Sequence, residues 1–133
     1  GTACRGSAAG HSVSEIRLAA RAPEGGRMLP DAYPQGSGAV LCAWRTLTYA
    51  DRAFENLSGF ATDIPAQDRR ALVQKSYTAE VYRNARSGED AAQITPLCTL
   101  VDDQDGHLIL PALSHVPPLA FHDLAIQLLS HLF

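Results

Sequence analysis

The 133-residue sequence lacks an excess of positive charge and long apolar runs, and each shortage argues against a class of protein. Eleven basic residues stand against fourteen acidic ones, and the formal net charge is −3. Nucleic-acid binders are usually basic because phosphate contacts drive their affinity, so we expect no nucleic-acid partner. No apolar run reaches the roughly 18 residues that a membrane-spanning helix needs, so we expect no transmembrane segment.

Closely spaced cysteines are also missing. Cys4, Cys42 and Cys98 stand far apart, so neither a zinc knuckle nor a thioredoxin-type redox pair is encoded. Cys42 and Cys98 lie in apolar runs and are expected to be buried free thiols. A disulfide between them is the alternative for an exported protein. The sequence leaves the localisation open between the cytoplasm and export after removal of a signal.

The motifs of nucleotide, metal and serine chemistry do not occur. No Walker, dinucleotide or G-x-S-x-G spacing is present. The acidic run 102–106 resembles part of a calcium loop, but an EF-hand aligned on Gly106 would place Val101 and Ala112 at ligand positions. No two of the five histidines have the spacing of a helical zinc pair. We therefore predict no metal site and no cofactor.

What is present indicates one folded domain over residues 1–133. Hydrophobic residues make up 46% of the chain, which suffices for a core. Residues 1–11, rich in Gly, Ala and Ser, predict a flexible tail, and residues 23–38 predict a long Pro/Gly loop. Residues 12–22 fit either a capped helix or an alternating strand. We favour a strand or a helix-to-strand mixture, which would supply a third strand to a sheet.

Three helices are expected in the remainder. Apolar residues at three- and four-residue steps predict one over 39–58, with an interruption near Tyr49. Asp63 and Pro65 open a second, which we expect to run to Ser87 and Gly88. Residues 118–133 predict a terminal helix that is apolar around most of its circumference and must be covered by the domain or by a partner. The residues of its narrow polar stripe are Asp123, Gln127, Ser130 and His131.

A hairpin completes the fold. Two apolar runs, 97–101 and 107–110, flank an Asp-Gly pair at 105–106, which is typical of a tight hairpin turn. The order of elements predicts the α+β class. In this fold two central helices and a C-terminal helix pack on a small antiparallel sheet that includes the hairpin at about 96–110.

The missing catalytic motifs and the apolar terminal helix favour a non-enzymatic protein-interaction domain. Such a domain would be an accessory, adaptor, chaperone or immunity-type protein that binds another protein or a second copy of itself. Aromatic residues in exposed positions are typical anchors of interfaces. The candidate binding residues are Tyr33, Tyr82 and Phe133.

The alternative function is a small hydrolase. Its nucleophile would be Cys42, activated by a base. A second version uses a group made of His115, His122 and Asp123, because His122 and Asp123 form an adjacent pair of the kind found in metal-dependent phosphohydrolases.

Overall fold

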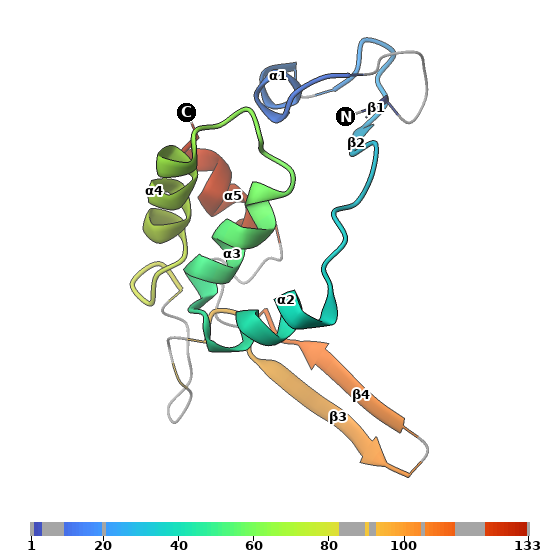
Figure 1. Cartoon of the computed structure of the whole chain (residues 1–133), viewed down its shortest axis with the longest axis vertical. Helices are drawn as coiled ribbons and strands as arrows, with labels where there is room; N and C mark the ends of the chain where they lie inside the picture. Colours follow the sequence, from blue (N-terminus) through green and yellow to red (C-terminus); the bar gives the residue numbers. More distant parts are fainter. Residues whose placement is uncertain are drawn as a thin grey trace. The chain divides into compact units, whose positions relative to one another are not determined.

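A computed structural model describes residues 2–3, 10–19, 21–82, 90, 93–104, 106–113 and 122–132 (Figure 1). Helices alternate with two short antiparallel sheets among these residues, which confirms the α+β class. The chain divides into two compact units, Gly1–Ala71 and Leu72–Phe133. The prediction of one domain over 1–133 stays a prediction. No helix within the described ranges has the length and apolar character that crossing a membrane requires.

The first unit begins with a two-residue ladder. Strand β1 (Thr2–Ala3) pairs antiparallel with β2 (Met28–Leu29), with Thr2 opposite Leu29. Part of the segment predicted as a tail is therefore paired with part of the predicted Pro/Gly loop. The rest of residues 1–9 lies outside the described residues.

Helix α1 (Val13–Ala19) replaces the strand that we favoured for residues 12–22, and that expectation is wrong. A capping box decides the outcome. The Ser12 N–H donates to Glu15 Oε2 at 2.8 Å, and the Glu15 N–H donates to Ser12 Oγ at 3.3 Å. The backbone N–H groups of Ser12 and Glu15 thus find side-chain partners at the start of a helix. An alternating strand would not offer them these partners. The described residues of the range 12–22 thus add no third strand.

The interruption expected near Tyr49 is confirmed. Helix α2 (Gly38–Ala43) runs into a 3-10 helix, η1 (Trp44–Thr46), before α3 (Tyr49–Ser58) begins. Thr48 caps α3: its Oγ1 accepts the Asp51 N–H at 3.1 Å and its hydroxyl donates to Asp51 Oδ2 at 2.7 Å. Asp51, the polar residue that interrupts the apolar pattern of 39–58, is thus the partner of Thr48 in the cap of a new helix.

Helix α4 (Ala66–Ser76) starts where Pro65 predicts but ends earlier than expected. Thr78 opens a separate turn, because its Oγ1 accepts the Val81 N–H at 3.2 Å and its carbonyl accepts the Tyr82 N–H at 3.0 Å. A hydroxyl that bonds to nearby backbone competes with helix continuation. The expected end near Ser87 and Gly88 lies outside the described residues.

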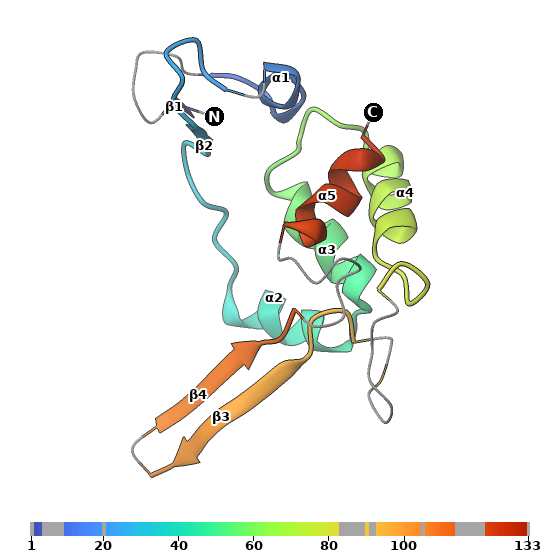
Figure 2. The same ribbon diagram turned by 180° about the vertical axis from the view of Figure 1, so that it is seen from behind.

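The most deeply buried side chains described in the second unit lie between residues 73 and 94. Those with less than 2% exposure are Val73, Ser76, Tyr82 and Ile94. Helix α5 (Asp123–Ser130) lies beside the last turn of α4 (Figure 2). Two hydrogen bonds join them: Ser76 Oγ donates to the Gln127 carbonyl at 3.3 Å and Tyr77 Oη donates to the Leu124 carbonyl at 3.2 Å.

The orientation of α5 differs from the sequence expectation. Asp123, placed on the expected polar stripe, is only 7% exposed, whereas Ile126 and Leu129 are 50% and 42% exposed. Serine and tyrosine hydroxyls on the facing segment provide polar partners for this side of the helix. Part of the apolar surface of α5 is therefore left uncovered by the described residues.

The predicted hairpin is confirmed and is longer than expected. Strands β3 (Leu97–Asp103) and β4 (Gly106–Pro111) pair antiparallel, with Cys98 opposite Leu110 and Thr99 opposite Ile109. The register shifts between Thr99 and Val101, which leaves one extra residue on β3 as a bulge. Asp105 of the expected turn lies outside the described residues.

Candidate functional site

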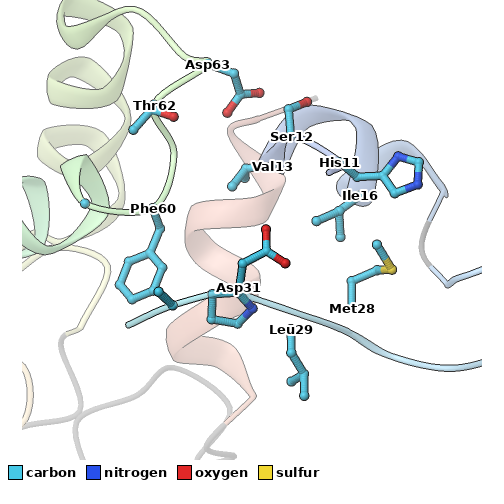
Figure 3. A pocket seen from close by; sticks show the side chains of 13 residues that line it. His11, Ser12, Val13, Ile16, Met28, Leu29, Asp31, Phe60, Thr62 and Asp63 are labelled. Atoms are coloured by element: carbon cyan, nitrogen blue, oxygen red, sulfur yellow. The ribbon is translucent and has the colours of Figure 1, made fainter. Parts of the chain in front are cut away.

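The first unit contains a pocket of about 370 Å³ (Figure 3). Three segments line it. They are residues 11–16, which lead into α1, residues 28–32, which begin with β2, and residues 59–63, which connect α3 to α4. Figure 3 shows Val13 and Ile16 projecting from α1 toward the segment that carries Met28. Polar side chains at the pocket belong to His11, Ser12, Asp31, Thr62 and Asp63.

Asp63 connects two of the segments that line this pocket. Its Oδ2 accepts the backbone N–H of Ser14 at 2.9 Å, which connects the α3–α4 turn to the first turn of α1. Burial raises the pKa of Asp63, but hydrogen bonds from Ser14 and Ser12 outweigh it and hold that pKa below its usual value. Asp63 was expected to cap α4, and no sequence pattern indicated its contact 49 residues back along the chain.

Glu15 stabilises the same end of α1. The backbone and side-chain hydrogen bonds with Ser12 lower the pKa of Glu15 below its usual value. His11 Nδ1 lies 3.8 Å from Glu15 Oε2. Glu15 and Asp63 are thus both engaged with the backbone of α1, so their charges serve to position this helix.

The loop that carries Tyr33 is fastened to the end of α3. The rings of Tyr33 and Phe60 meet edge to face, with centroids 6.5 Å apart. A Cβ added at Gly59 would lie only 2.8 Å from Pro34 Cγ, so the loop passes closely over this glycine. The predicted loop over 23–38 is therefore packed against the helical part of the first unit at this point.

The predicted catalytic residues form no complete catalytic group among the described residues. Cys42, expected to be buried, is exposed on α2, because α2 has no buried residue at all. His122 is exposed and Asp123 is buried at the start of α5, and Asp123 Oδ2 has no hydrogen-bond partner. His115 lies outside the described residues. No cluster of three metal-ligating side chains occurs in the described part of the chain.

The predicted binding residues have different environments. Tyr33 is 67% exposed, as an interface anchor requires, and its binding role stays a prediction. Tyr82 has no exposure, and its ring lies 6.0 Å from that of Tyr77. The structure thus places Tyr82 in the core and corrects the expectation that it is a surface anchor. Phe133 lies outside the described residues. Cys98, the other cysteine expected to be buried, is exposed and free.

Comparison with known proteins identifies the family. Residues 2–77 match the family described as "threonine synthase N terminus". The chain belongs to this family. The matched segment covers almost all of the first unit, with its pocket, and continues to the end of α4.

Relatives named threonine synthase match nearly the whole chain. The protein of Methylobacillus glycogenes is 50% identical over 129 residues, which is 97% of this chain and 26% of that relative. The protein of Corynebacterium glutamicum is 37% identical over 90% of the chain and 24% of its own length. The protein of Saccharomyces cerevisiae is 31% identical over 92% of this chain and 23% of its own length. The chain thus spans about a quarter of the length of these relatives.

These similarities overturn the functional expectation from the sequence. A non-enzymatic accessory or adaptor domain was expected, whereas the relatives are named as an enzyme. The absence of a local catalytic motif was misleading because the chain corresponds to only part of each relative's length. The family was identified from a match over residues 2–77 and from relatives that match nearly the whole chain.

Proposed function

We propose that this chain acts as the N-terminal domain of a threonine synthase. The observation that carries the proposal is the family match over residues 2–77, supported by 50% identity to the Methylobacillus relative over nearly the whole chain. The matched segment covers almost all of the first unit and extends to the end of α4. The activity belongs to a longer polypeptide, because the chain spans about a quarter of its relatives.

Within that enzyme, the first unit supplies a framework rather than a complete reaction centre. Asp63 and Glu15 have lowered pKa values because both bind the backbone of α1 or its cap. A carboxylate held ionised by such bonds is poorly suited to exchange protons near neutral pH. We therefore assign these two groups to positioning α1 at the rim of the pocket.

A segment exchange tests the proposed function. Residues 2–77 of this chain would replace the matching segment of the Methylobacillus relative, and the graft would be expressed in a threonine auxotroph. We expect growth without threonine. The matched control carries Ala61→Asp in the graft, which places a charge at a position with no exposure and should abolish growth. A soluble, folded graft that does not support growth would contradict the proposal.

The chain by itself provides a second test. We expect it to fold but to support no growth of the auxotroph, because about three quarters of the relatives' length is absent from it. Growth supported by the 133 residues alone would show that the activity does not depend on a longer polypeptide.

A further inference from the structure

The hairpin carries an apolar face that nothing in the described chain covers. Leu108 and Leu110 point to the same side of β4, since alternate residues of a strand share a face. The register places Cys98 opposite Leu110 and Val101 opposite Leu108. These four residues, Cys98, Val101, Leu108 and Leu110, form what we call the apolar hairpin face.

The bulge creates this face. Cys98 and Val101 are three positions apart, so a regular strand would direct them to opposite sides. The pairs Thr99–Ile109 and Val101–Leu108 follow each other directly, with one extra residue on β3 between them. That extra residue brings Val101 to the side of Cys98, so the pairs Cys98–Leu110 and Val101–Leu108 share one face of the hairpin.

The opposite face is mixed. It carries the pairs Leu97–Pro111 and Thr99–Ile109, and near the turn it carries Asp102 and His107. His107 Nδ1 lies 2.6 Å from Asp102 Oδ1, and both side chains are exposed. The end of this face next to the turn is therefore polar, and the two faces differ in what they can contact.

The apolar hairpin face is open to solvent in the structure. Val101, Leu108 and Leu110 are 41%, 54% and 51% exposed, and Cys98 is exposed as well. An isolated two-stranded hairpin is at best marginally stable in water, and an exposed apolar patch usually marks a contact surface. This face therefore needs a cover.

We propose that the apolar hairpin face docks onto the part of the threonine synthase polypeptide that lies outside this chain. The inference rests on the proposed function, because it names the remainder of that enzyme as the partner. The Methylobacillus relative matches 129 of the 133 residues, so its counterpart of the hairpin is part of a much longer polypeptide. The hairpin also follows residue 77, where the N-terminal family match ends. Its location is that of a segment joining the N-terminal domain to the rest of the enzyme.

The thiol of Cys98 reports directly on this face. Its alkylation by iodoacetamide would be followed by mass spectrometry in the isolated chain and in a longer polypeptide where the chain replaces the matched quarter of the Methylobacillus relative. We expect Cys98 to react freely in the isolated chain. In the longer polypeptide we expect a reaction roughly tenfold slower or more, because a covered thiol reacts only after local opening. Equal rates in the two polypeptides would overturn the proposal.

Two neighbouring residues provide a matched pair of variants. Leu108 and Ile109 are exposed to similar extents, 54% and 50%, but lie on opposite faces. In the longer polypeptide, Leu108→Asp should restore fast reaction at Cys98, whereas Ile109→Asp should not. Leu108→Ala and Ile109→Ala repeat the comparison with a milder change, should an added charge prevent folding. Equal effects of the two alanine variants would contradict docking through this face.

The same experiment separates the other outcomes. If a second copy of the chain covers the face, Cys98 in the isolated chain will become protected as the chain concentration rises, and the proposal will be wrong. The growth test of the proposed function uses only residues 2–77 of this chain, so the hairpin of this chain is not part of that graft. Loss of growth together with protection of Cys98 would therefore contradict the proposed function but support the docking. Growth together with an unprotected Cys98 would support the proposed function but contradict the docking.

Discussion

The second unit buries some of its apolar residues but leaves those of its hairpin exposed. Val73, Tyr82 and Ile94 have at most 2% exposure, whereas every hairpin residue whose exposure is described is exposed. Burial requires a facing surface as well as an apolar sequence. The difference shows that apolar sequence alone does not bury an element, and an apolar element left exposed is a candidate contact surface.

The largest expected effect concerns a buried residue of the second unit. Tyr82→Ala removes a fully buried ring beside Tyr77 and should lower the free energy of unfolding by about 3–5 kcal/mol. Urea denaturation of the chain would measure the loss. The control, Leu110→Ala, alters a residue that is 51% exposed and should cost no more than about 0.5 kcal/mol. Similar losses for both variants would abolish the distinction between core and hairpin.

A second substitution extends the comparison to the first unit. Gly59→Ala places a Cβ 2.8 Å from Pro34 Cγ and should cost about 1–3 kcal/mol, because the loop must move away. Gly38→Ala is the control, since its added Cβ meets nothing within 4 Å. Thermal unfolding of the two variants should show a clear drop in Tm for Gly59→Ala alone. An unchanged Tm would mean that the loop is not packed on α3.

A third test concerns the attachment of α1 through Asp63. Asp63→Ala leaves the Ser14 N–H without its carboxylate partner and should cost about 1 kcal/mol at neutral pH, as for the loss of a helix cap. Asp63→Asn keeps the shape without the charge and should cost less.

The pH dependence of this contact follows from its pKa. The pKa of Asp63 is lower in the folded chain, so its contribution is complete above the unfolded value of about 3.9 and is lost as the pH falls through the folded value. Denaturant titrations between neutral pH and pH 3 should show a larger loss in the parent than in Asp63→Asn, in which the lowered pKa of Glu15 still contributes. The same decline in that variant would assign the effect to other carboxylates.

The smallest expected effect is at Arg70, which joins α3 to α4. Its guanidinium carbon lies 4.0 Å from the centre of the Phe54 ring, and its Nη1 is 3.2 Å from Asp51 Oδ1. Because the pair is largely exposed, Arg70→Met should cost about 0.5–1 kcal/mol, and Arg70→Lys less. Urea titrations at low and high salt would separate the two contacts, since only the ion pair weakens with salt.

Features fixed by local chemistry could be predicted from the sequence. Pro65 marks the start of α4, the polar residue Asp51 marks the interruption before α3, and the apolar runs around residues 105–106 mark the hairpin. In each case a residue acts within a few positions of itself through a cap, a fixed φ angle or a turn. These are the parts of the α+β prediction that the structure confirms.

Features fixed by distant partners could not be predicted. Cys42 was expected inside because its neighbours are apolar, but α2 presents no buried face. Asp63 was assigned to the helix that follows it, whereas its carboxylate binds α1. The functional expectation failed for another reason: the chain spans about a quarter of its relatives, and the absence of a catalytic motif from that part was read as the absence of an enzyme.

Amide hydrogen exchange tests most directly whether the hairpin needs the remainder of the enzyme. Exchange would be compared between the isolated chain and the longer polypeptide that carries it. We predict that the amides of β3 and β4 exchange much more slowly in the longer polypeptide, while those around Val73 and Tyr82 change little, because the chain already buries them. Hairpin amides that exchange equally fast in both polypeptides would contradict this account.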